Sequence, residues 1–341
     1  MRQDGIAGVV SQHWAARDVA VAPLDAGRNN PTLRVGIAGR CYAARLYRNL
    51  DVAGIRREHA LLGVLAGAGL PFRVPQPAPC RDGRTFAHTD DGILALFAWI
   101  GGQYPDRGNP GHLYATGAAL AELDEALLRL DGTLAGLPGD PAPRHGELHR
   151  IHPAVPDAAA LPRRLADDPR LREVAEPIAW LEAAIADCLQ TVPRLYAGLP
   201  QQWVHQDLAL SNVLQRGGRV RGVLDFEFAD RDLRALDLVS MLTNTIGDFA
   251  DPAGWQQAET LCRGYCARVR LGEAEIEALP DLVRLRYVAV NIHGAGRWLA
   301  GLNPVEEVAR RLLYGAACDR IIQQQADRLR GLVRAVSVDR G

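Results

Sequence analysis

The sequence predicts an α+β protein, with a small antiparallel sheet and one helix in its first hundred residues and a larger, mainly helical part after them. Three observations predict this class. Short apolar runs separated by turn residues fill positions 19–99, helical periodicity dominates beyond them, and one short β segment interrupts the helices at 203–225. A chain of 341 residues is long enough for two cores, and we expect residues 1–100 and 101–341 to form them.

The strands of the first part are indicated by the turns between them. Runs of β-branched, aromatic and aliphatic residues are separated by Gly, Pro, Asn and Asp, and they predict strands at 19–24, 32–37, 41–47, 85–88 and 93–99. Pro23 cannot donate a ladder hydrogen bond, so the first strand is expected at an edge of the sheet. Residues 52–67 change to a helical period and predict the single helix of this part.

The second part is predicted to be helical because apolar residues recur there three and four positions apart. The expected helices span 112–130, 171–189, 233–246, 254–269, 279–299 and 305–333, the last of them broken near Gly315. Residues 131–160 are rich in Pro, Gly and Ala, which predicts a loop over the surface.

The composition excludes several classes of protein. Lys and Arg number 39 against 40 Asp and Glu, a formal net charge of −1, and this balance argues against nucleic-acid binding, which favours a basic surplus. No apolar segment is long enough to span a bilayer, and the six cysteines form no C-x-x-C pair. We therefore expect a cytoplasmic protein with reduced thiols and no membrane partner. The chain contains no lysine, so every basic residue is an arginine.

The β segment at 203–225 carries the residues that indicate chemistry. An apolar strand delivers His205 and Asp207 to a loop, the loop returns to Asn212 five residues later, and the next apolar strand ends at Asp225. Phosphoryl transfer requires a carboxylate that orients the acceptor hydroxyl and hard oxygen ligands for Mg²⁺. We expect Asp207 to be the catalytic base, with His205 beside it, and Asn212 and Asp225 to hold the metal. If these residues only capped turns, the carboxylate at the end of an apolar strand would be unexplained.

The full spacing, His-x-Asp-x-x-x-x-Asn followed by Asp-Phe-Glu, resembles the aminoglycoside phosphotransferase and choline kinase family of small-molecule kinases. Segments 42–48 and 223–229 look like the homoserine-kinase-type branch of that family. The resemblance implies a protein-kinase-like fold of two lobes: an N-terminal nucleotide-binding lobe and a helical C-terminal lobe that binds the acceptor. It also implies Mg²⁺ and transfer of the γ-phosphate of ATP or GTP to a small-molecule hydroxyl, for example on an antibiotic or on homoserine. Gln206 stands where the family often has Gly, and Asp237 matches a position that braces the catalytic loop.

The resemblance also assigns residues to the nucleotide. Arg45 occupies the position of the family's phosphate-binding lysine, and an arginine binds phosphate with a different geometry. Glu58 falls on the apolar face of helix 52–67, where a carboxylate requires a partner, and Arg45 is expected to be that partner rather than a neighbour such as Arg57. Phe97 and Trp99 match the hinge that meets the base, although Trp99 is equally well explained as core. Gly27 lies in the segment that would cover the phosphates.

Two sets of residues suggest the acceptor. Arg286, His293 and Arg297 are seven and four positions apart and share one helix face, which favours an acceptor with a carboxylate or a phosphate if that face lines the site. The alternative is a solvated face or salt bridges to acids elsewhere. A second set of acids near the metal segment could instead hold an amine, and it consists of Glu227, Asp230 and Asp232.

Two other functions remain open from the sequence. Arg45 in place of lysine would also suit a catalytically silent nucleotide sensor or scaffold, and a protein Ser/Thr residue could be the acceptor. The choice between ATP and GTP, the identity of the acceptor and the oligomeric state are not specified by these motifs.

Overall fold

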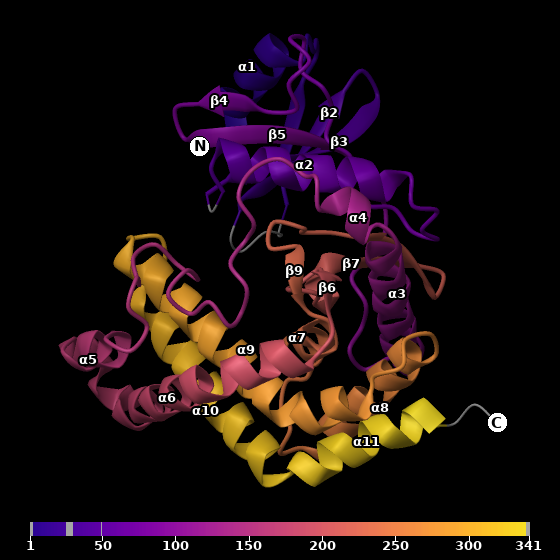
Figure 1. Ribbon diagram of the computed structural model, residues 1–341. Helices are drawn as coiled ribbons and strands as arrows, with labels where there is room; N and C mark the ends of the chain where they lie inside the picture. The colour runs from indigo at the N-terminus through magenta and orange to yellow at the C-terminus, as the bar shows by residue number, and fades with distance from the viewer. Residues whose placement is uncertain (1–2, 25–29, 49, 339–341) are drawn as a thin grey trace. The chain divides into compact units, whose positions relative to one another are not determined.

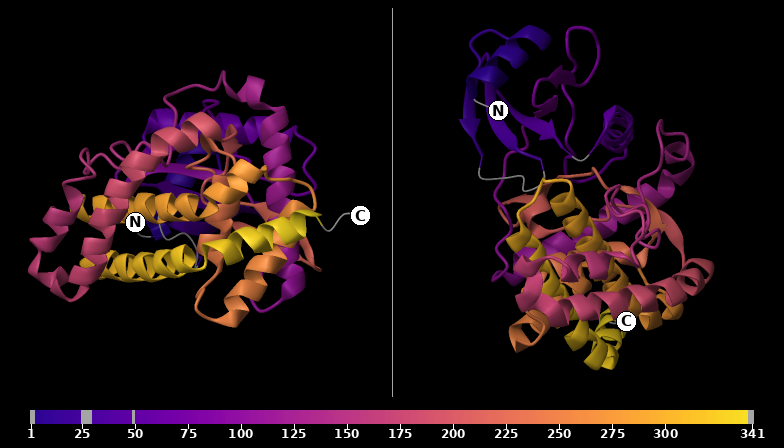
Figure 2. Two further views of the ribbon diagram at one scale, coloured as in Figure 1. Left: turned by 60° about the horizontal axis from the view of Figure 1, so that its bottom comes forward. Right: turned by 90° about the vertical axis from the view of Figure 1, so that its left-hand side faces the viewer.

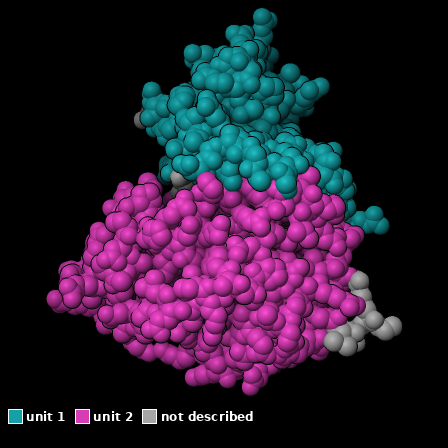
Figure 3. Space-filling model, in the orientation of Figure 1, with its two compact units in different colours: residues 1–104, 132–140, 212–227 teal, residues 105–131, 141–211, 228–341 magenta. Residues whose placement is uncertain are grey.

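The computed structural model describes residues 3–24, 30–48 and 50–338. The chain forms two compact units, coloured separately in Figure 3, and each is described by itself. Unit 1 comprises Met1–Tyr104, Gly132–Asp140 and Asn212–Glu227, and unit 2 comprises Pro105–Asp131, Pro141–Ser211 and Phe228–Gly341. Unit 1 therefore takes in two segments that lie well beyond residue 100 in the sequence.

Unit 1 is built on a five-stranded antiparallel sheet with the order β1-β2-β3-β5-β4 (Figure 1). The strands are β1 (Ala20–Pro23), β2 (Thr32–Ile37), β3 (Arg40–Tyr47), β4 (Ala87–Thr89) and β5 (Gly92–Ala98). The structure confirms that the strand containing Pro23 lies at an edge. The fourth strand begins two residues later than the sequence predicted.

The two faces of this sheet are covered by different helices. Ala44 and Leu46 of β3 pack in one apolar cluster with Ile6 and Val10 of α1 (Gln3–His13). Arg45, between them in the strand, points to the other face because successive side chains alternate, and there it meets α2 (Val52–Ala66). The sequence analysis missed α1, whose glycines and sparse apolar positions give a weak helical period; its packing on the sheet stabilises it.

A hairpin completes unit 1. It consists of β7 (Val213–Arg216) and β8 (Arg219–Val223), joined by Gly217 and Gly218 with φ of 60° and 72°. Two consecutive residues with positive φ form the turn that matches the twist of paired strands, and glycine adopts it without strain. The structure thus confirms the turn that the sequence predicted at 216–219.

Unit 2 is mainly helical (Figure 2). The longest helix, α9, packs against α6, α7, α10 and α11, and α3 packs against α8. The helices of unit 2 are α3 (Pro110–Arg129), α5 (Leu161–Ala166), α6 (Ala175–Gly198), α7 (Ala235–Thr245), α8 (Pro252–Cys266), α9 (Glu273–Leu299), α10 (Val305–Gln324) and α11 (Ala326–Val338). The short α4 (Asp131–Leu134) lies almost wholly in unit 1, which takes in residues 132–140. Among the described helices, none combines the length and the apolar composition needed to cross a membrane.

The last predicted helix is broken at a different place. The interruption lies at Gln325, between α10 and α11, and not near Gly315. Gly315 lies within α10, and a Cβ added there would lie 2.7 Å from the side-chain amide nitrogen of Asn291 and 3.2 Å from the ring of Trp180. A glycine that signals a break by propensity is therefore present here to permit close packing.

Unit 2 also contains a two-stranded sheet that the sequence did not predict in full. β6 (Gln201–Val204) pairs with β9 (Asp230–Leu233), so that Val204 lies opposite Asp230. β9 consists of Asp, Arg, Asp and Leu, a composition with low strand propensity, which explains why it was missed. The chain segment that leaves β6 carries the catalytic motif.

Candidate active site

The loop after β6 is fixed by a buried carboxylate of α7. Asp237 accepts hydrogen bonds from the backbone N–H groups of His205 at 2.6 Å and Gln206 at 2.7 Å. His205 is fully buried, and its Nδ1 accepts a hydrogen bond from the backbone N–H of Asp207 at 3.3 Å. Asp237 and His205 thus position the loop, and the exposed carboxylate of the motif is that of Asp207, whose side chain is 27% accessible.

Gln206 adopts a left-handed backbone conformation with φ of 67°. L-residues are strained in this region, and glycine is not. The Ser240 hydroxyl donates to the Gln206 carbonyl at 3.0 Å, and together with Asp237 it holds this conformation. The structure therefore explains why glycine suits this position of the motif.

The Asp207 carboxylate is oriented by two donors. Its Oδ1 accepts hydrogen bonds from Nη2 of Arg286 at 2.7 Å and from Nδ2 of Asn244 at 3.1 Å. Asn244 was missed by the sequence analysis. Along α7, Ser240 follows Asp237 by three residues and Asn244 follows Ser240 by four. This spacing places the three side chains on one helix face and could have identified Asn244.

The stripe of Arg286, His293 and Arg297 belongs to one buried cationic region. Burial first, and then the positive charges of His152, Arg311, Arg297 and Arg286, lower the pKa of His293 to about 3, so it is neutral at pH 7. Arg286 and Arg297 are 8% and 3% exposed, which excludes a solvated face, whereas a salt bridge, the other alternative, is present between Arg286 and Asp207. Burial also leaves Nε of Arg286 without a hydrogen-bond partner among the described residues.

The cationic side chains of this region have both acidic and neutral partners. Arg286 pairs with Asp207, and Arg311 donates to Glu307 at 2.8 Å. Arg297 donates from Nε to the amide oxygen of Asn303 at 3.1 Å. Contact between this region and an anionic group of the acceptor stays a prediction.

Arg45 is the centre of an ion-pair network in unit 1. Its Nη1 lies 3.2 Å from Glu58, and its Nη2 lies 2.6 Å from Asp225 and 3.2 Å from Glu227. The expected partnership of Arg45 with Glu58 is present, and Tyr47 donates to the same Glu58 carboxylate at 2.7 Å. Desolvation by burial, opposed by Arg45 and reinforced by Asp225 and Glu58, raises the pKa of Glu227 to about 8.

The two predicted metal ligands, Asn212 and Asp225, lie at the open end of the hairpin, on neighbouring backbone segments. Val213 pairs with Val223, and the backbone N–H of Leu224 donates to the Asn212 carbonyl at 2.8 Å, so Asn212 and Asp225 follow one another closely in space. Asp225 has φ of 67° and a side chain that is 27% accessible. Amide and carboxylate oxygens are ligands that suit Mg²⁺, which takes its remaining ligands from phosphates and water.

No group of three His, Cys, Asp or Glu residues in the described ranges could hold a metal by itself. The role of Asn212 and Asp225 as metal ligands stays a prediction. Asp207 belongs to unit 2, and its convergence with Asn212 and Asp225 stays a prediction.

The residues expected at the nucleotide base have mixed surroundings. Phe97 is buried, with its ring 5.4 Å from that of His59, so it belongs to the core of unit 1. Trp99 is half-buried, and the Arg34 guanidinium lies 5.3 Å from its ring centre. Gly27 lies outside the described residues.

The acids that were expected to hold an amine have structural partners instead. Asp232 is fully buried and accepts hydrogen bonds from the Tyr196 hydroxyl at 2.5 Å and the His145 backbone N–H at 2.8 Å. Asp230 is buried and accepts from the Ala142 backbone N–H at 2.8 Å. Glu227 is enclosed by Arg45 and by Asn30, whose Nδ2 lies 2.6 Å away. These contacts brace loops and strands, and the hypothesis that the three acids contact the acceptor stays a prediction.

Comparisons with known proteins identify the family and the fold. The chain matches the phosphotransferase enzyme family over residues 20–279. It is 27% identical over 300 residues to a homoserine kinase of Gluconacetobacter diazotrophicus, a match that covers 85% of this chain and 88% of that protein. A microcompartment-associated aminopropanol kinase has a TM-score of 0.68 at 20% identity and covers 95% of this chain and 98% of its own. An amicoumacin kinase in complex with AMP-PNP, Ca²⁺ and Ami has a TM-score of 0.63 at 14% identity and covers 94% of each chain.

The structural similarities show a protein-kinase-like fold. The chain is a small-molecule kinase, and the sensor alternative is not favoured. Because the family match extends over residues 20–279, about three quarters of the sequence, this chain belongs to the phosphotransferase enzyme family.

Proposed function

We propose that this kinase transfers the γ-phosphate of ATP, bound with Mg²⁺, to the hydroxyl of a small amino-acid-like acceptor that carries a carboxylate. The observation that carries this proposal is the contact of Arg286 with Asp207. The base candidate lies beside a buried cationic region, and Arg286 has an Nε that makes no hydrogen bond to a described residue. An acceptor that brings its own carboxylate would satisfy this donor.

The residues divide the work of an in-line transfer. Asp207 orients the acceptor hydroxyl and takes its proton as the new O–P bond forms and the bond from the γ-phosphorus to the bridging oxygen breaks. Asn212 and Asp225 would hold Mg²⁺, which supplies positive charge to the phosphates when it is bound. Arg45 would contact the same phosphates, and Glu58 keeps its guanidinium in place.

The cationic region also favours one class of acceptor over another. A polycationic aminoglycoside would be repelled by Arg286, Arg297 and Arg311, whereas an α-amino acid carboxylate would be attracted. The names of the relatives, homoserine kinase and aminopropanol kinase, both describe a short chain with a hydroxyl and an amine. The carboxylate distinguishes the first acceptor from the second, so homoserine is the better representative of the class. ATP is supported by the AMP-PNP complex of the amicoumacin kinase.

The test is an acceptor panel. Homoserine, 1-amino-2-propanol and kanamycin are assayed with ATP and with GTP, and we expect the highest kcat/KM with homoserine and ATP. Arg286→Gln should raise the KM for homoserine by about 100-fold, as expected for a lost charge-assisted contact, and change that for 1-amino-2-propanol little. Arg320→Gln, an exposed change on α10, is the control. Asp207→Asn should lower kcat by about 10²- to 10⁴-fold.

Two results would contradict the proposal. Preferred phosphorylation of kanamycin would exclude the carboxylate-bearing acceptor. Equal activity of Asp207→Asn and the unchanged protein would exclude Asp207 as the base.

A further inference from the structure

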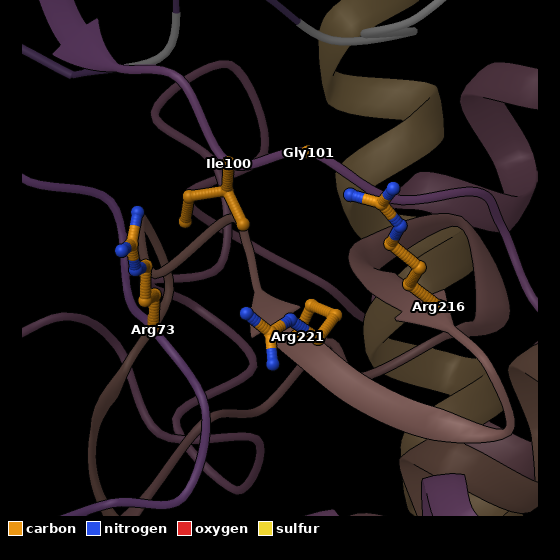
Figure 4. A pocket seen from close by; sticks show the side chains of 5 residues that line it. All are labelled: Arg73, Ile100, Gly101, Arg216 and Arg221. Carbon is orange, nitrogen blue, oxygen red and sulfur yellow. The ribbon is translucent and has the colours of Figure 1, made fainter.

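A second cationic feature lies in unit 1, apart from the residues assigned to the nucleotide, the metal and the acceptor. It is a cavity of about 140 Å³ lined by Arg73, Ile100, Gly101, Arg216 and Arg221 (Figure 4). Figure 4 shows the three guanidinium groups around the side chain of Ile100. The arginines come from two distant parts of the sequence, the segment after α2 and the β7–β8 hairpin. The fold therefore gathers them at one place.

The backbone beneath this cavity is held by hydrogen bonds. The N–H of Arg73 donates to the Arg221 carbonyl at 3.0 Å, and the N–H of Val223 donates to the Arg73 carbonyl at 3.0 Å. On the other side, Gln103 and Gln215 exchange two backbone hydrogen bonds of 2.9 and 2.8 Å. These contacts fix where the arginine side chains originate.

Two glycines allow the walls of the cavity to approach each other. A Cβ on Gly222 would lie 2.7 Å from Cγ2 of Ile100, and a Cβ on Gly102 would lie 2.9 Å from Cβ of Leu214. Both distances are shorter than a normal carbon contact, so any other residue would force the hairpin away from the segment 100–103. The close approach that shapes the cavity depends on glycine at these positions.

The charges of the cavity are not balanced by the described part of the protein. None of the side chains of Arg73, Arg216 and Arg221 forms an ion pair or a hydrogen bond with a described residue. Arg45 in the same unit, in contrast, meets three carboxylates. Three like charges around one small cavity repel one another, and an anion bound between them would remove that repulsion.

We propose that this cavity binds a phosphate group, either as inorganic phosphate or as the phosphate ester of a small metabolite. A guanidinium presents its N–H groups as a planar fork that matches two oxygens of a phosphate. Arginines from two sides of a cavity can therefore hold one tetrahedral anion with several charge-assisted hydrogen bonds. Ile100 gives the cavity an apolar wall suited to the carbon part of an ester.

The test separates this site from the nucleotide site. The protein is first saturated with AMP-PNP and Mg²⁺, and inorganic phosphate is then titrated by calorimetry at low ionic strength; glycerol 3-phosphate is titrated in a second arm. We expect binding at one site, and a loss of affinity of at least about tenfold in the double variant Arg73→Gln/Arg221→Gln. Arg219→Gln, an exposed change on the same hairpin outside the cavity, should alter the affinity by less than about twofold.

The remaining outcomes are equally specific. Tighter binding of glycerol 3-phosphate than of inorganic phosphate would identify an ester as the occupant, and the reverse would identify free phosphate. Unchanged affinity for AMP-PNP shows that each variant is folded; if the double variant is not, Arg216→Gln is measured in its place, and the same loss is expected. Absence of phosphate binding to the saturated protein, or an equal loss in Arg219→Gln, would overturn the proposal.

Discussion

At the scale of single residues, the motif relies on backbone conformations that L-residues seldom adopt. Gln206 precedes the base candidate and Asp225 is the carboxylate at the hairpin, and both have φ of 67°. Each such conformation costs about 1–2 kcal/mol and persists because surrounding hydrogen bonds enforce it. The strain places the Asp207 and Asp225 side chains where a regular strand would not.

Replacing Gln206 by glycine should therefore be tolerated. Glycine adopts positive φ freely, and the relief of strain offsets the greater flexibility that glycine gives the unfolded chain. We expect the free energy of unfolding of Gln206→Gly to stay within about 1 kcal/mol of the unchanged protein or to rise. The control is Gln256→Gly on the exposed face of α8, which should lose about 1 kcal/mol. A larger loss for Gln206→Gly than for Gln256→Gly in urea unfolding would contradict the strain argument.

Glu227 should make stability depend on pH in an unusual direction. Its pKa rises from the ordinary 4.5 to about 8 in the folded protein, so the folded state binds the proton more tightly. Its contribution is therefore fully present below the unfolded pKa and is lost as the pH rises through about 8. Glu227→Gln, which stays uncharged, should reduce the fall in unfolding free energy between about pH 5 and about pH 9 by on the order of 2 kcal/mol.

Urea unfolding at several pH values measures this effect. Glu259→Gln, on the exposed face of α8, serves as the control and should leave the pH dependence as it is. A pH dependence that is the same with and without Glu227 would show that Arg45 and Asn30 keep this carboxylate ionised.

Residue-level expectations succeeded where burial demands a partner. The carboxylate of Glu58 on an apolar helix face required a cation, and the structure places Arg45 3.2 Å from it. They did not reveal the bracing contacts of Asp230 and Asp232, because these contacts follow from the pairing of β9 with β6. A strand of such polar composition cannot be recognised from its own residues, so its burial was not foreseen.

At the scale of elements, α3 and α8 cross at two glycines. A Cβ on Gly117 of α3 would lie 2.1 Å from the carbonyl oxygen of Leu261, and a Cβ on Gly264 of α8 would lie 2.2 Å from that of Tyr114. The atoms in the way are backbone, which cannot rotate aside. The helices therefore approach as closely as their main chains allow.

Replacing either glycine, even by alanine, should destabilise the protein. We expect Gly264→Ala to lower the free energy of unfolding by about 3 kcal/mol or more, because the two helices must separate. Gly63→Ala in α2, where nothing lies within 4 Å of the added Cβ, should raise it by about 0.5–1 kcal/mol. Thermal and urea unfolding measure both. Equal effects of the two substitutions would show that the crossing is looser than the structure indicates.

The predicted boundaries of strands and helices agree with the structure where turn residues determine them. The hairpin at 216–219 was predicted because paired glycines permit one turn geometry. The helix break predicted near Gly315 is absent, because this glycine allows Asn291 and Trp180 to pack closely against the helix and does not end it. Propensity describes what a residue favours in an isolated helix, whereas packing against neighbouring side chains determines the role of Gly315.

At the scale of the whole molecule, the class of enzyme could be predicted from the sequence because the motif that indicates it lies in one contiguous segment. The spacing of His205, Asp207, Asn212 and Asp225 indicated a kinase, and the family match over residues 20–279 confirms that class. The sequence did not predict that residues 212–227 belong to unit 1. It arises from long-range pairing, such as that of Arg73 with Arg221, which no local pattern announces.

The absence of lysine has a practical consequence for finding this enzyme. Affinity probes that survey nucleotide-binding proteins commonly acylate the amine beside the phosphates, and the residue that we propose for that place here is Arg45, whose guanidinium is not acylated under such conditions. A chemical survey based on amine labelling would pass over this protein even in cells where it is abundant and active. Dicarbonyl reagents, which condense with guanidinium groups, would be the appropriate labels.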